Sequence, residues 1–229
     1  AELARILNEN AKLRFSPGSK YAYSNISYWL LGQIIERVTG ISYEDYMVRE
    51  IFRPLGINPA AAAFVIATPD EHARGYLREW SMPDLLKGFL VDQKFIGKYE
   101  AGWLNINDHY LNGAAFGGLV ASAQTVGIFL RDQLQPKSAI LAPGAKELFY
   151  QQQMTPGGKA VPMTLGWHVG TTGGKSSARY YFKEGGGAGF HCEMRLYPEQ
   201  GLASVVMANS MAFDVKTFLQ EADAEFLAA

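Results

Sequence analysis

The stretch Phe182–Asn209 reads FKEGGGAGFHCEMRLYPEQGLASVVMAN and decides the fold of this chain. Residues 190–197 alternate between apolar and polar side chains, which is the pattern of a strand with one buried face. Residues 198–201, Pro-Glu-Gln-Gly, predict a turn, and the apolar run 202–208 suits a central strand. The stretch therefore predicts an antiparallel hairpin around which the rest of the chain is organised.

A lysine and a run of glycines stand directly before this hairpin, in the order Lys183, Glu184, Gly185, Gly186, Gly187. A backbone without Cβ atoms lets a substrate carbonyl come close to main-chain N–H groups. A lysine beside it supplies positive charge where an oxyanion or a carboxylate would lie. The segment is interpreted as a catalytic edge, with a flexible glycine-rich turn between two strands as the alternative.

The composition describes an ordinary globular protein, because 48% of the 229 residues are hydrophobic, 13% aromatic and 19% charged. A net charge of −1 argues against a nucleic-acid partner, which requires a basic surface. No apolar run approaches the roughly 20 residues that span a membrane. The single cysteine, Cys192, excludes an internal disulfide, and its place on the apolar face of its strand predicts a buried structural thiol.

Apolar periodicity predicts helices in the first half of the chain and strands in the second. Residues 58–118 show no sustained period, so we expect loops and short elements there, with a lid or substrate-facing insertion as one role for them. The resulting fold class is α+β, an antiparallel β-sheet with flanking helices. Helices are predicted for residues 3–13, 28–40, 122–134, 143–153 and after Asp214, with a short one after Ser42, and strands for 164–170, 178–183, 190–197 and 202–208.

Three familiar kinds of site are poorly supported. Residues 170–176 look like a phosphate loop, but Val169 stands where that motif requires glycine, and a strand rather than a helix is predicted to follow. The four histidines are scattered without ligand spacing, so we expect no metal. No G-x-S-x-G elbow occurs, which leaves an α/β-hydrolase reading without a nucleophile.

The triplet Tyr23-Ser24-Asn25, considered together with Lys183, indicates a catalytic site. A tyrosine serves as a general base only if neighbouring cations lower its pKa from about 10 in water. A lysine on a facing strand edge is a neighbour of that kind, and Asn25 offers both a donor and an acceptor to an ester or amide. The alternatives for the individual residues are a packed aromatic for Tyr23 and a helix cap for Asn25.

Together these segments resemble the serine β-lactamase and penicillin-binding-protein superfamily, specifically its class C β-lactamase-like and family VIII carboxylesterase branch. Tyr23-Ser24-Asn25 matches the Y-x-N motif, and Lys183-Glu184-Gly185 stands where that family has K-T-G or H-x-G. The resemblance covers nearly the whole chain. Its other segments are Pro17-Gly18, the helix 28–40, residues 51–56 (IFRPLG), Gly117-Gly118-Leu119 before the Ser122 helix, Gly189-Phe190, Tyr197-Pro198-Glu199 and Asn209.

The resemblance implies a serine hydrolase that forms an acyl-enzyme on a small-molecule ester, amide or lactam, without cofactor or metal. Glu184 departs from the usual small or hydroxyl residue, and we expect it either to pair with Lys183 or to shift preference toward short esters. The resemblance implies catalytic roles for Tyr23 and Lys183, and substrate binding by Asn25, Glu184, Gly185, Gly186 and Asn209.

The larger departure is the nucleophile, because no serine here has a lysine three positions later, as S-x-x-K requires. We expect a single incomplete domain over 1–229, with a helical part over 14–135 and strands and a helix over 160–229. It would be the C-terminal portion of a longer hydrolase, with an exposed sheet edge or groove that pairs with the missing N-terminal portion or forms a homodimer. The alternatives are a non-catalytic binding or scaffold module, or a relocated nucleophile at Ser24, Ser176 or Ser177.

Overall fold

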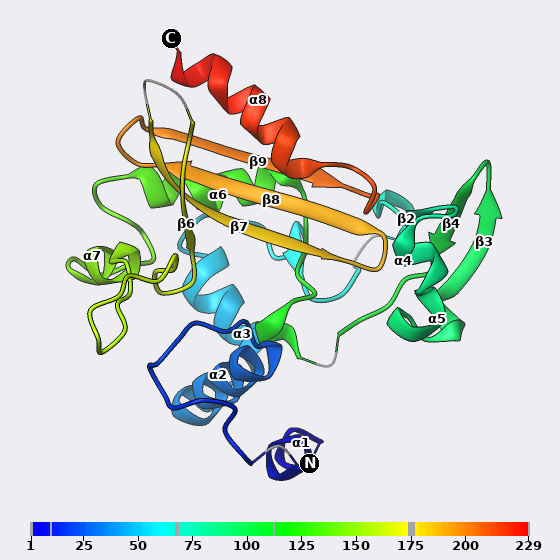
Figure 1. Cartoon of the computed structure of the whole chain (residues 1–229), viewed down its shortest axis with the longest axis horizontal. Helices are drawn as coiled ribbons and strands as arrows, with labels where there is room; N and C mark the ends of the chain where they lie inside the picture. Colours follow the sequence, from blue (N-terminus) through cyan, green and yellow to red (C-terminus); the bar gives the residue numbers. More distant parts are fainter. Residues whose placement is uncertain (1, 10, 67–68, 112, 174–176, 229) are drawn as a thin grey trace.

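Helices pack against antiparallel sheets in the computed structural model, which describes residues 2–9, 11–66, 69–111, 113–173 and 177–228 (Figure 1). The main sheet has four strands in the order β6-β7-β8-β9. They are β6 (His168–Thr171), β7 (Arg179–Gly187), β8 (Phe190–Tyr197) and β9 (Leu202–Ala208). The predicted α+β arrangement and the predicted hairpin are confirmed.

Strand β7 is longer than the sequence predicts, because the glycines belong to it. Gly185, Gly186 and Gly187 pair with Cys192, His191 and Phe190 of β8. The chain reverses through Ala188 and Gly189, both with positive φ (49° and 88°), as a two-residue hairpin turn requires. The reading of these glycines as a flexible turn is therefore wrong.

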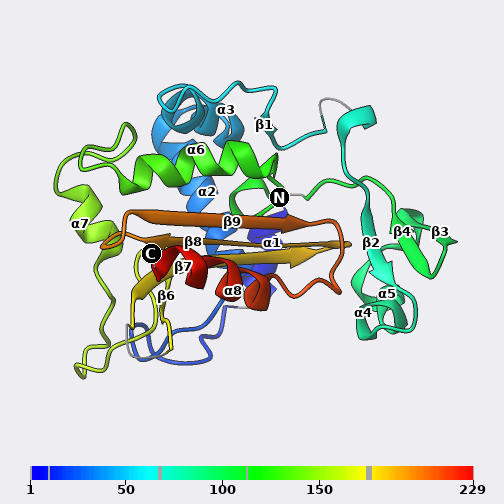
Figure 2. The same ribbon diagram turned by 90° about the horizontal axis from the view of Figure 1, so that it is seen from above.

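Helices cover both faces of the main sheet. Figure 2 shows α6 (Ala123–Leu134) and α8 (Val215–Leu227) on opposite sides of it. Leu130 of α6 packs with Trp167 and Leu196, which are at most 3% exposed. On the other face, Val215 and Leu219 of α8 are fully buried, so each helix presents an apolar stripe to the sheet.

The polar face of β8 is buried too, contrary to the prediction of a single buried face. Beneath α8, Arg195 donates from Nε to Glu193 (2.5 Å) and from Nη1 to Asp223 (3.3 Å). Tyr197 also donates its hydroxyl to Asp223 (2.8 Å). Glu193, Arg195 and Asp223 are at most 3% exposed, so α8 closes over a paired charge cluster.

A second sheet forms within residues 58–118, where the sequence shows no sustained period. Its strands follow the order β2-β4-β3, and Glu100 faces Trp103 across a tight turn at Ala101-Gly102. The element bounds are β2 (Gly75–Arg78), β3 (Ile96–Glu100) and β4 (Trp103–Ile106), with α4 (Met82–Leu85), α5 (Lys87–Leu90), η2 (Pro69–Glu71) and η3 (Gln93–Phe95) beside them.

The small sheet meets the main sheet backbone to backbone. The Tyr76 N–H lies 3.1 Å from the carbonyl of Gly189 and 3.0 Å from that of Asn209. A Cβ on Gly189 would lie 2.4 Å from the backbone carbon of Gly75, a distance that no side chain tolerates. We call this contact, made by Gly75, Tyr76, Gly189 and Asn209, the glycine joint.

Helix α3 lies on the α6 side of the sheet (Figure 2), and α1 lies apart from the sheet, below α2 (Figure 1). Helix α2 begins after Ser24, whose hydroxyl accepts from the Ser27 N–H, and ends at Gly40 with a left-handed φ of 74°. The predicted helix is confirmed. The remaining elements are α1 (Glu2–Glu9), α2 (Asn25–Thr39), α3 (Tyr43–Met47), η1 (Val48–Phe52), β1 (Ala62–Ala63), η4 (Ala114–Phe116), β5 (Val120–Ala121) and α7 (Ala145–Tyr150).

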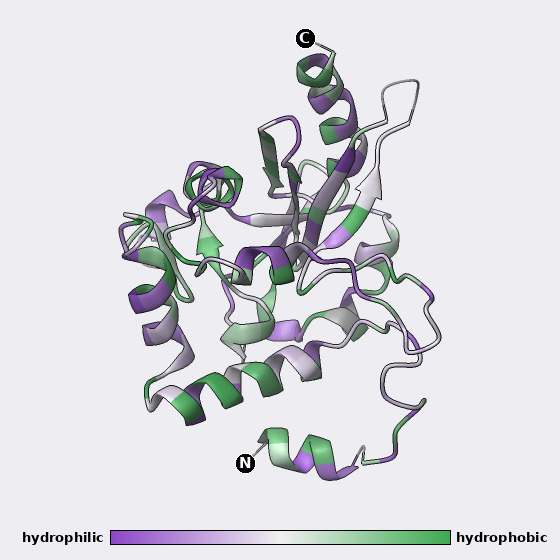
Figure 3. Ribbon diagram, turned by 90° about the vertical axis from the view of Figure 1, so that its left-hand side faces the viewer, coloured by the Kyte–Doolittle hydropathy of each residue, from purple (hydrophilic) through white to green (hydrophobic). Residues whose placement is uncertain are grey.

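Two apolar surfaces have no covering element among the described residues. Leu31, Ile34 and Val38 of α2 are 52, 48 and 79% exposed, and Figure 3 shows apolar bands along this helix. Among the described residues, strand β9 pairs only with β8, so it lies at the end of this sheet rather than at the predicted central position. Its apolar sequence suits burial between α6 and α8, while its outer edge carries no ladder in the described chain.

Candidate active site

The second half of β7 has one unpaired edge within the described residues. The pairing of β6 with β7 stops at His168, the first residue of β6, which lies opposite Phe182. The pairing of β8 with β7 continues to Gly187. From Lys183 onward, the edge of β7 that faces away from β8 therefore carries no strand. Backbone groups along such an edge remain available to a ligand.

Of the glycines along this edge, Gly185 is crowded by the residue across from it, whereas Gly186 has ordinary contacts there. A Cβ on Gly185 would lie 3.2 Å from the sulfur of Cys192, and one on Gly186 would lie 3.4 Å from His191. Cys192 itself is half-buried and donates its thiol to the carbonyl of Gly185 (3.4 Å). The edge thus has no side chains between Glu184 and Ala188, which leaves its backbone open to close approach.

Lys183 points to the face that α2 occupies. In β7 it shares that face with Tyr181, which belongs to the core cluster of α6. Its Nζ lies 5.5 Å from the ring centroid of Tyr28 in α2, and burial lowers the pKa of its ammonium. No ion pair to Lys183 occurs in the part of the chain that the structure describes, so its charge is not compensated by a carboxylate.

Three tyrosines gather at the start of α2. Burial raises the pKa values of Tyr21 and Tyr28, and electrostatic interaction with Tyr23 raises both further. Tyr23 itself is 64% exposed. The Y-x-N motif and Lys183, which are 160 residues apart in the chain, therefore meet in one region through Tyr28.

Asn25 and the candidate serines have defined places. Asn25 is the first residue of α2, and its exposed side chain makes no hydrogen bond to any described residue. The helix cap is Ser24, whose Oγ accepts from the Ser27 N–H (3.2 Å). Ser177 donates its hydroxyl to the carbonyl of Thr172 (3.1 Å). Ser176 lies outside the described residues, as do residues 174 and 175 of the apparent phosphate loop.

Glu184 lies on the opposite face of β7 from Lys183. Its carboxylate is 2.8 Å from Nε2 of His191, whose Nδ1 is 3.0 Å from the carbonyl of Phe213. Burial alone would lower the pKa of His191, but these two acceptors outweigh it and raise the pKa. The expected Lys183–Glu184 pair is not formed, because neighbouring residues of a strand point to opposite faces.

Asn209 lies at the glycine joint. Its side-chain amide donates to the carbonyl of Arg74 (3.0 Å), just before β2. It also lines a cavity of about 370 Å³ with Tyr76, Glu100 and Trp103. The structure therefore gives Asn209 a role in attaching the small sheet, separate from the Lys183 edge.

His168 adjoins the site and has no recognisable sequence signal. Its ring stacks on Phe182 at 5.0 Å and meets Tyr21 edge to face at 6.1 Å. Burial lowers its pKa, and the charge of Lys183 lowers it further. Neither His168 nor Tyr28 belongs to a motif. The pairing of β6 with β7 brings His168 near Lys183, and the packing of α2 brings Tyr28 to it.

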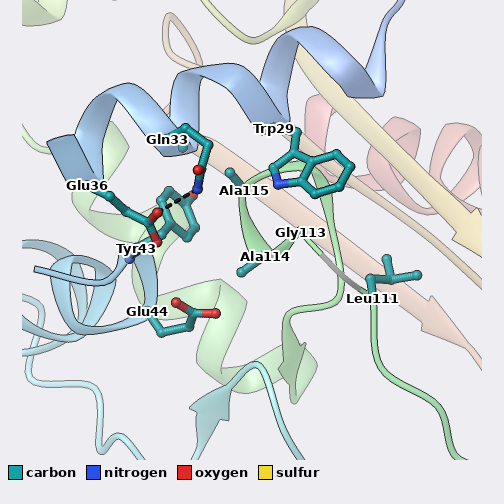
Figure 4. A pocket seen from close by; sticks show the side chains of 10 residues that line it. Trp29, Gln33, Glu36, Tyr43, Glu44, Leu111, Gly113, Ala114 and Ala115 are labelled. Carbon is teal, nitrogen blue, oxygen red and sulfur yellow. Dashed lines mark hydrogen bonds between the residues drawn. The ribbon is translucent and has the colours of Figure 1, made fainter. Parts of the chain in front are cut away.

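A separate cavity of about 250 Å³ runs between α2, α3 and η4 (Figure 4). Trp29 forms one wall and the carboxylates of Glu36 and Glu44 lie at its other end. Glu36 is held in place because it accepts from the Tyr43 N–H (3.0 Å) and from the Gln33 amide (2.5 Å). None of the predicted site residues lines this cavity.

No group of three potential metal ligands is found among the described residues, and none of the described helices is long and apolar enough to cross a membrane.

Comparison with known proteins relates the sequence of this chain to a known family. The sequence matches the β-lactamase family over residues 2–227. It is 26% identical over 212 residues to penicillin-binding protein 4* of Bacillus subtilis strain 168, which covers 89% of this chain and 43% of that protein. The chain therefore spans less than half the length of this relative.

Solved structures share the fold. An octameric penicillin-binding protein homologue from Pyrococcus abyssi superposes with a TM-score of 0.76 at 22% identity, covering 99% of this chain and 47% of that one. The D-amino acid amidase of Ochrobactrum anthropi SV3, complexed with D-phenylalanine, gives 0.73 at 20% identity and covers 99% of this chain and 64% of that one.

Proposed function

The chain belongs to the β-lactamase family, and from that premise we propose that it is the C-terminal portion of a serine hydrolase whose nucleophile lies outside this sequence. It forms part of a single, incomplete β-lactamase-like domain. The observation that carries the proposal is the unpaired β7 edge, where Lys183 faces the start of α2 with no carboxylate partner in the described chain. An uncompensated cation beside open backbone N–H groups suits an oxyanion.

The chemistry proceeds by acyl transfer. The serine oxygen attacks the substrate carbonyl while its proton passes to Tyr23, acting with the S-x-x-K lysine. The leaving group departs with a proton, and water then cleaves the acyl-enzyme to release the acid and regenerate the serine. Lys183 keeps the local potential positive, Asn25 orients the substrate, and the Gly186 N–H is one oxyanion donor. Removing one such donor typically lowers the rate about 100- to 1000-fold.

The substrate is a small-molecule ester, amide or lactam. The β7 edge supports this class, because Gly185 and Gly186 offer backbone and no side chain to a carbonyl. A D-amino acid amidase shares the fold, which is consistent with a substrate bearing an amide. Glu184 contributes no direct contact in this proposal, since its carboxylate is held by His191.

The exposed apolar face of α2 and the outer edge of β9 are the surface that pairs with the remaining portion of the protein. Val38 is 79% exposed at the end of an apolar stripe, and β9 carries no charge or proline that would discourage pairing. In the absence of that portion, two copies of this chain associate through the same surface. Static light scattering at micromolar concentration tests this, and a clean monomer would count against it.

Intact-mass spectrometry after exposure to a fluorophosphonate, and separately to a penicillin, tests the function. We expect no adduct on this chain and one stoichiometric adduct on a longer gene product that includes upstream sequence, mapped to an S-x-x-K serine. In that longer product, Tyr23→Phe and Lys183→Met should each slow acylation about 100-fold or more. A stoichiometric adduct within these 229 residues would overturn the proposal.

The second candidate is a non-catalytic ligand-binding or scaffold module of the same fold. The absence of S-x-x-K in this sequence favours it. The same experiment separates the two functions. A reading frame without upstream S-x-x-K, together with ligand binding and no adduct, would establish the binding module.

A further inference from the structure

We propose that Tyr28 is a positioning residue for Lys183. The ring of Tyr28 holds the ammonium of Lys183 at the unpaired edge of β7, next to α2, a task that a carboxylate could otherwise perform. The inference rests on the proposed function for its chemical meaning, while the contact itself stands on geometry. The Nζ of Lys183 lies 5.5 Å from the ring centroid of Tyr28, within the roughly 6 Å over which the face of an aromatic ring attracts a cation.

Both partners are fixed by the fold. Tyr28 lies in the first turn of α2, and its N–H bonds to the carbonyl of Ser24, the residue that caps the helix. Lys183 is the first residue of β7 beyond the end of β6, and it pairs with Met194 of β8. The contact therefore ties the Y-x-N segment to the strand edge directly, and losing it would free the longest side chain of that edge.

The other titratable groups near Lys183 do not take over this role. Glu184 is held by His191 on the opposite face of β7. His168 of β6 stacks on Phe182, and it couples to the lysine only as a source of like charge when protonated. Among the described residues, Tyr21 and Tyr23 make no hydrogen bond or cation–π contact with Lys183. Among the described side chains considered above, Tyr28 is thus the one that contacts the ammonium of Lys183.

An aromatic ring holds a cation without neutralising it, and this distinguishes Tyr28 from an acidic residue. A carboxylate at this position would form an ion pair and compete with an anionic substrate group or an oxyanion for the lysine. The ring face attracts the ammonium through its quadrupole and leaves the full positive charge available to the edge. Tyr28 thereby gives Lys183 a fixed position and an intact charge.

The test is the titration of Lys183 in this chain, followed by NMR of 13C-labelled lysine side chains and assigned with Lys183→Arg. Tyr28→Leu keeps a similar bulk over the lysine and removes the ring, so the Lys183 pKa should fall by roughly half a unit. Tyr28→Phe keeps the ring and should leave the pKa where it is. Trp29→Leu, on the neighbouring face of α2, is the matched control and should not move it.

Two results would overturn the inference. One is a Lys183 pKa unchanged in Tyr28→Leu; the other is a shift in Tyr28→Phe as large as that in Tyr28→Leu, which would make the hydroxyl the active group. Circular dichroism checks folding, and Tyr28→Met serves if Tyr28→Leu does not fold. Because the titration needs no turnover, it stands even if the longer gene product forms no acyl-enzyme. If acylation does occur, its alkaline pH limit should fall by the same half unit in Tyr28→Leu.

Discussion

Beneath α8 the main sheet buries one guanidinium between two carboxylates, whereas at the edge of β7 it leaves an ammonium facing only an aromatic ring. Arg195 bonds to Glu193 and Asp223, and all three are at most 3% exposed. Lys183 is half-buried and pairs with no carboxylate of the described chain. The two cations lie on neighbouring parts of one sheet and on its opposite faces.

The difference lies in what each charge contributes. Burying an ion pair is tolerable only when both partners and their remaining hydrogen bonds are present, so the α8 cluster fixes the helix against the sheet. An ammonium that is partly desolvated and unpaired destabilises the fold slightly, and it remains free to bind a negative group. The charges under α8 thus contribute to stability, whereas the charge at the β7 edge is available to bind a negative group.

The largest effect is expected from Arg195→Met, which leaves Glu193 and Asp223 buried without their cation. The free energy of unfolding should fall by about 3 to 5 kcal/mol, as for other buried ion pairs that lose one partner. Urea denaturation measures it. The matched control is Arg5→Met, which breaks an exposed pair with Glu9 and should change stability by less than about 0.5 kcal/mol. A loss below about 1 kcal/mol for Arg195→Met would show that α8 does not depend on this cluster.

Gly185→Ala should have the next largest effect, because its Cβ would meet the Cys192 sulfur at 3.2 Å. We expect a loss of about 1 kcal/mol, typical of mild overpacking. A double-mutant cycle with Cys192→Ala measures the coupling, since removing the sulfur should restore most of the loss caused by the alanine at 185. Additive effects of the two substitutions would mean that the cross-strand thiol does not dictate the glycine.

Lys183→Met should act in the opposite direction to Arg195→Met. Removing a half-buried charge that has no carboxylate partner should raise the free energy of unfolding. The gain should be only about 0.5 kcal/mol, because solvent screens part of the cost of burying the charge. Because burial lowers the folded-state pKa of Lys183 below 10.5, wild-type stability should rise with pH between the folded-state pKa and that value. The variant should lose this rise. A destabilisation by Lys183→Met would mean that the contact with the Tyr28 ring outweighs the cost of desolvating the ammonium.

The smallest effect concerns the His191–Glu184 pair. The pKa of His191 is raised in the folded state, so its contribution is fully present below about pH 6.5 and is lost as pH rises through the folded-state pKa. Glu184→Gln should remove about 0.3 kcal/mol of this dependence. His168, whose pKa is lowered, acts in the opposite direction, so the quantity to measure is the wild-type minus variant difference at pH 5.5 and pH 8.5. Equal differences at the two pH values would rule out the pair as a source of stability.

Local sequence patterns were sufficient where one element decides its own structure. The alternation in 190–197 and the apolar periodicity of 28–40 predict β8 and α2, and both are present, although the helix cap is Ser24 rather than Asn25. The pattern could not reveal that β8 is covered on both faces, because the partner of Arg195 lies 28 residues away at Asp223 in another element. Alternation identifies polar positions, and only the packing of α8 decides that they are buried.

The site was partly predictable for a similar reason. Tyr23 and Lys183 belong to motifs that resemble a known family, and their catalytic roles stay predictions, while the structure brings Tyr28, three residues after the Y-x-N motif, next to Lys183. Tyr28 and His168 escape prediction because their proximity to Lys183 depends on how α2 packs near β7 and on where the pairing of β6 with β7 stops. The small sheet was missed because β2, β3 and β4 are only four or five residues long, and the pairing of β3 is irregular between Ile96 and Tyr99.

The glycine joint has a consequence for how this protein diverges. Tyr76 bonds main chain to main chain with Gly189 and Asn209, and the buried side chains of Leu77, Leu104 and Ile106 add apolar contacts with Ala188 and Met211. The exposed part of the small sheet, away from these contacts, can then change in length and sequence without disturbing the neighbouring strand edge. We therefore expect related chains to differ in length and sequence mainly in the small sheet, and to keep Gly75 and Gly189.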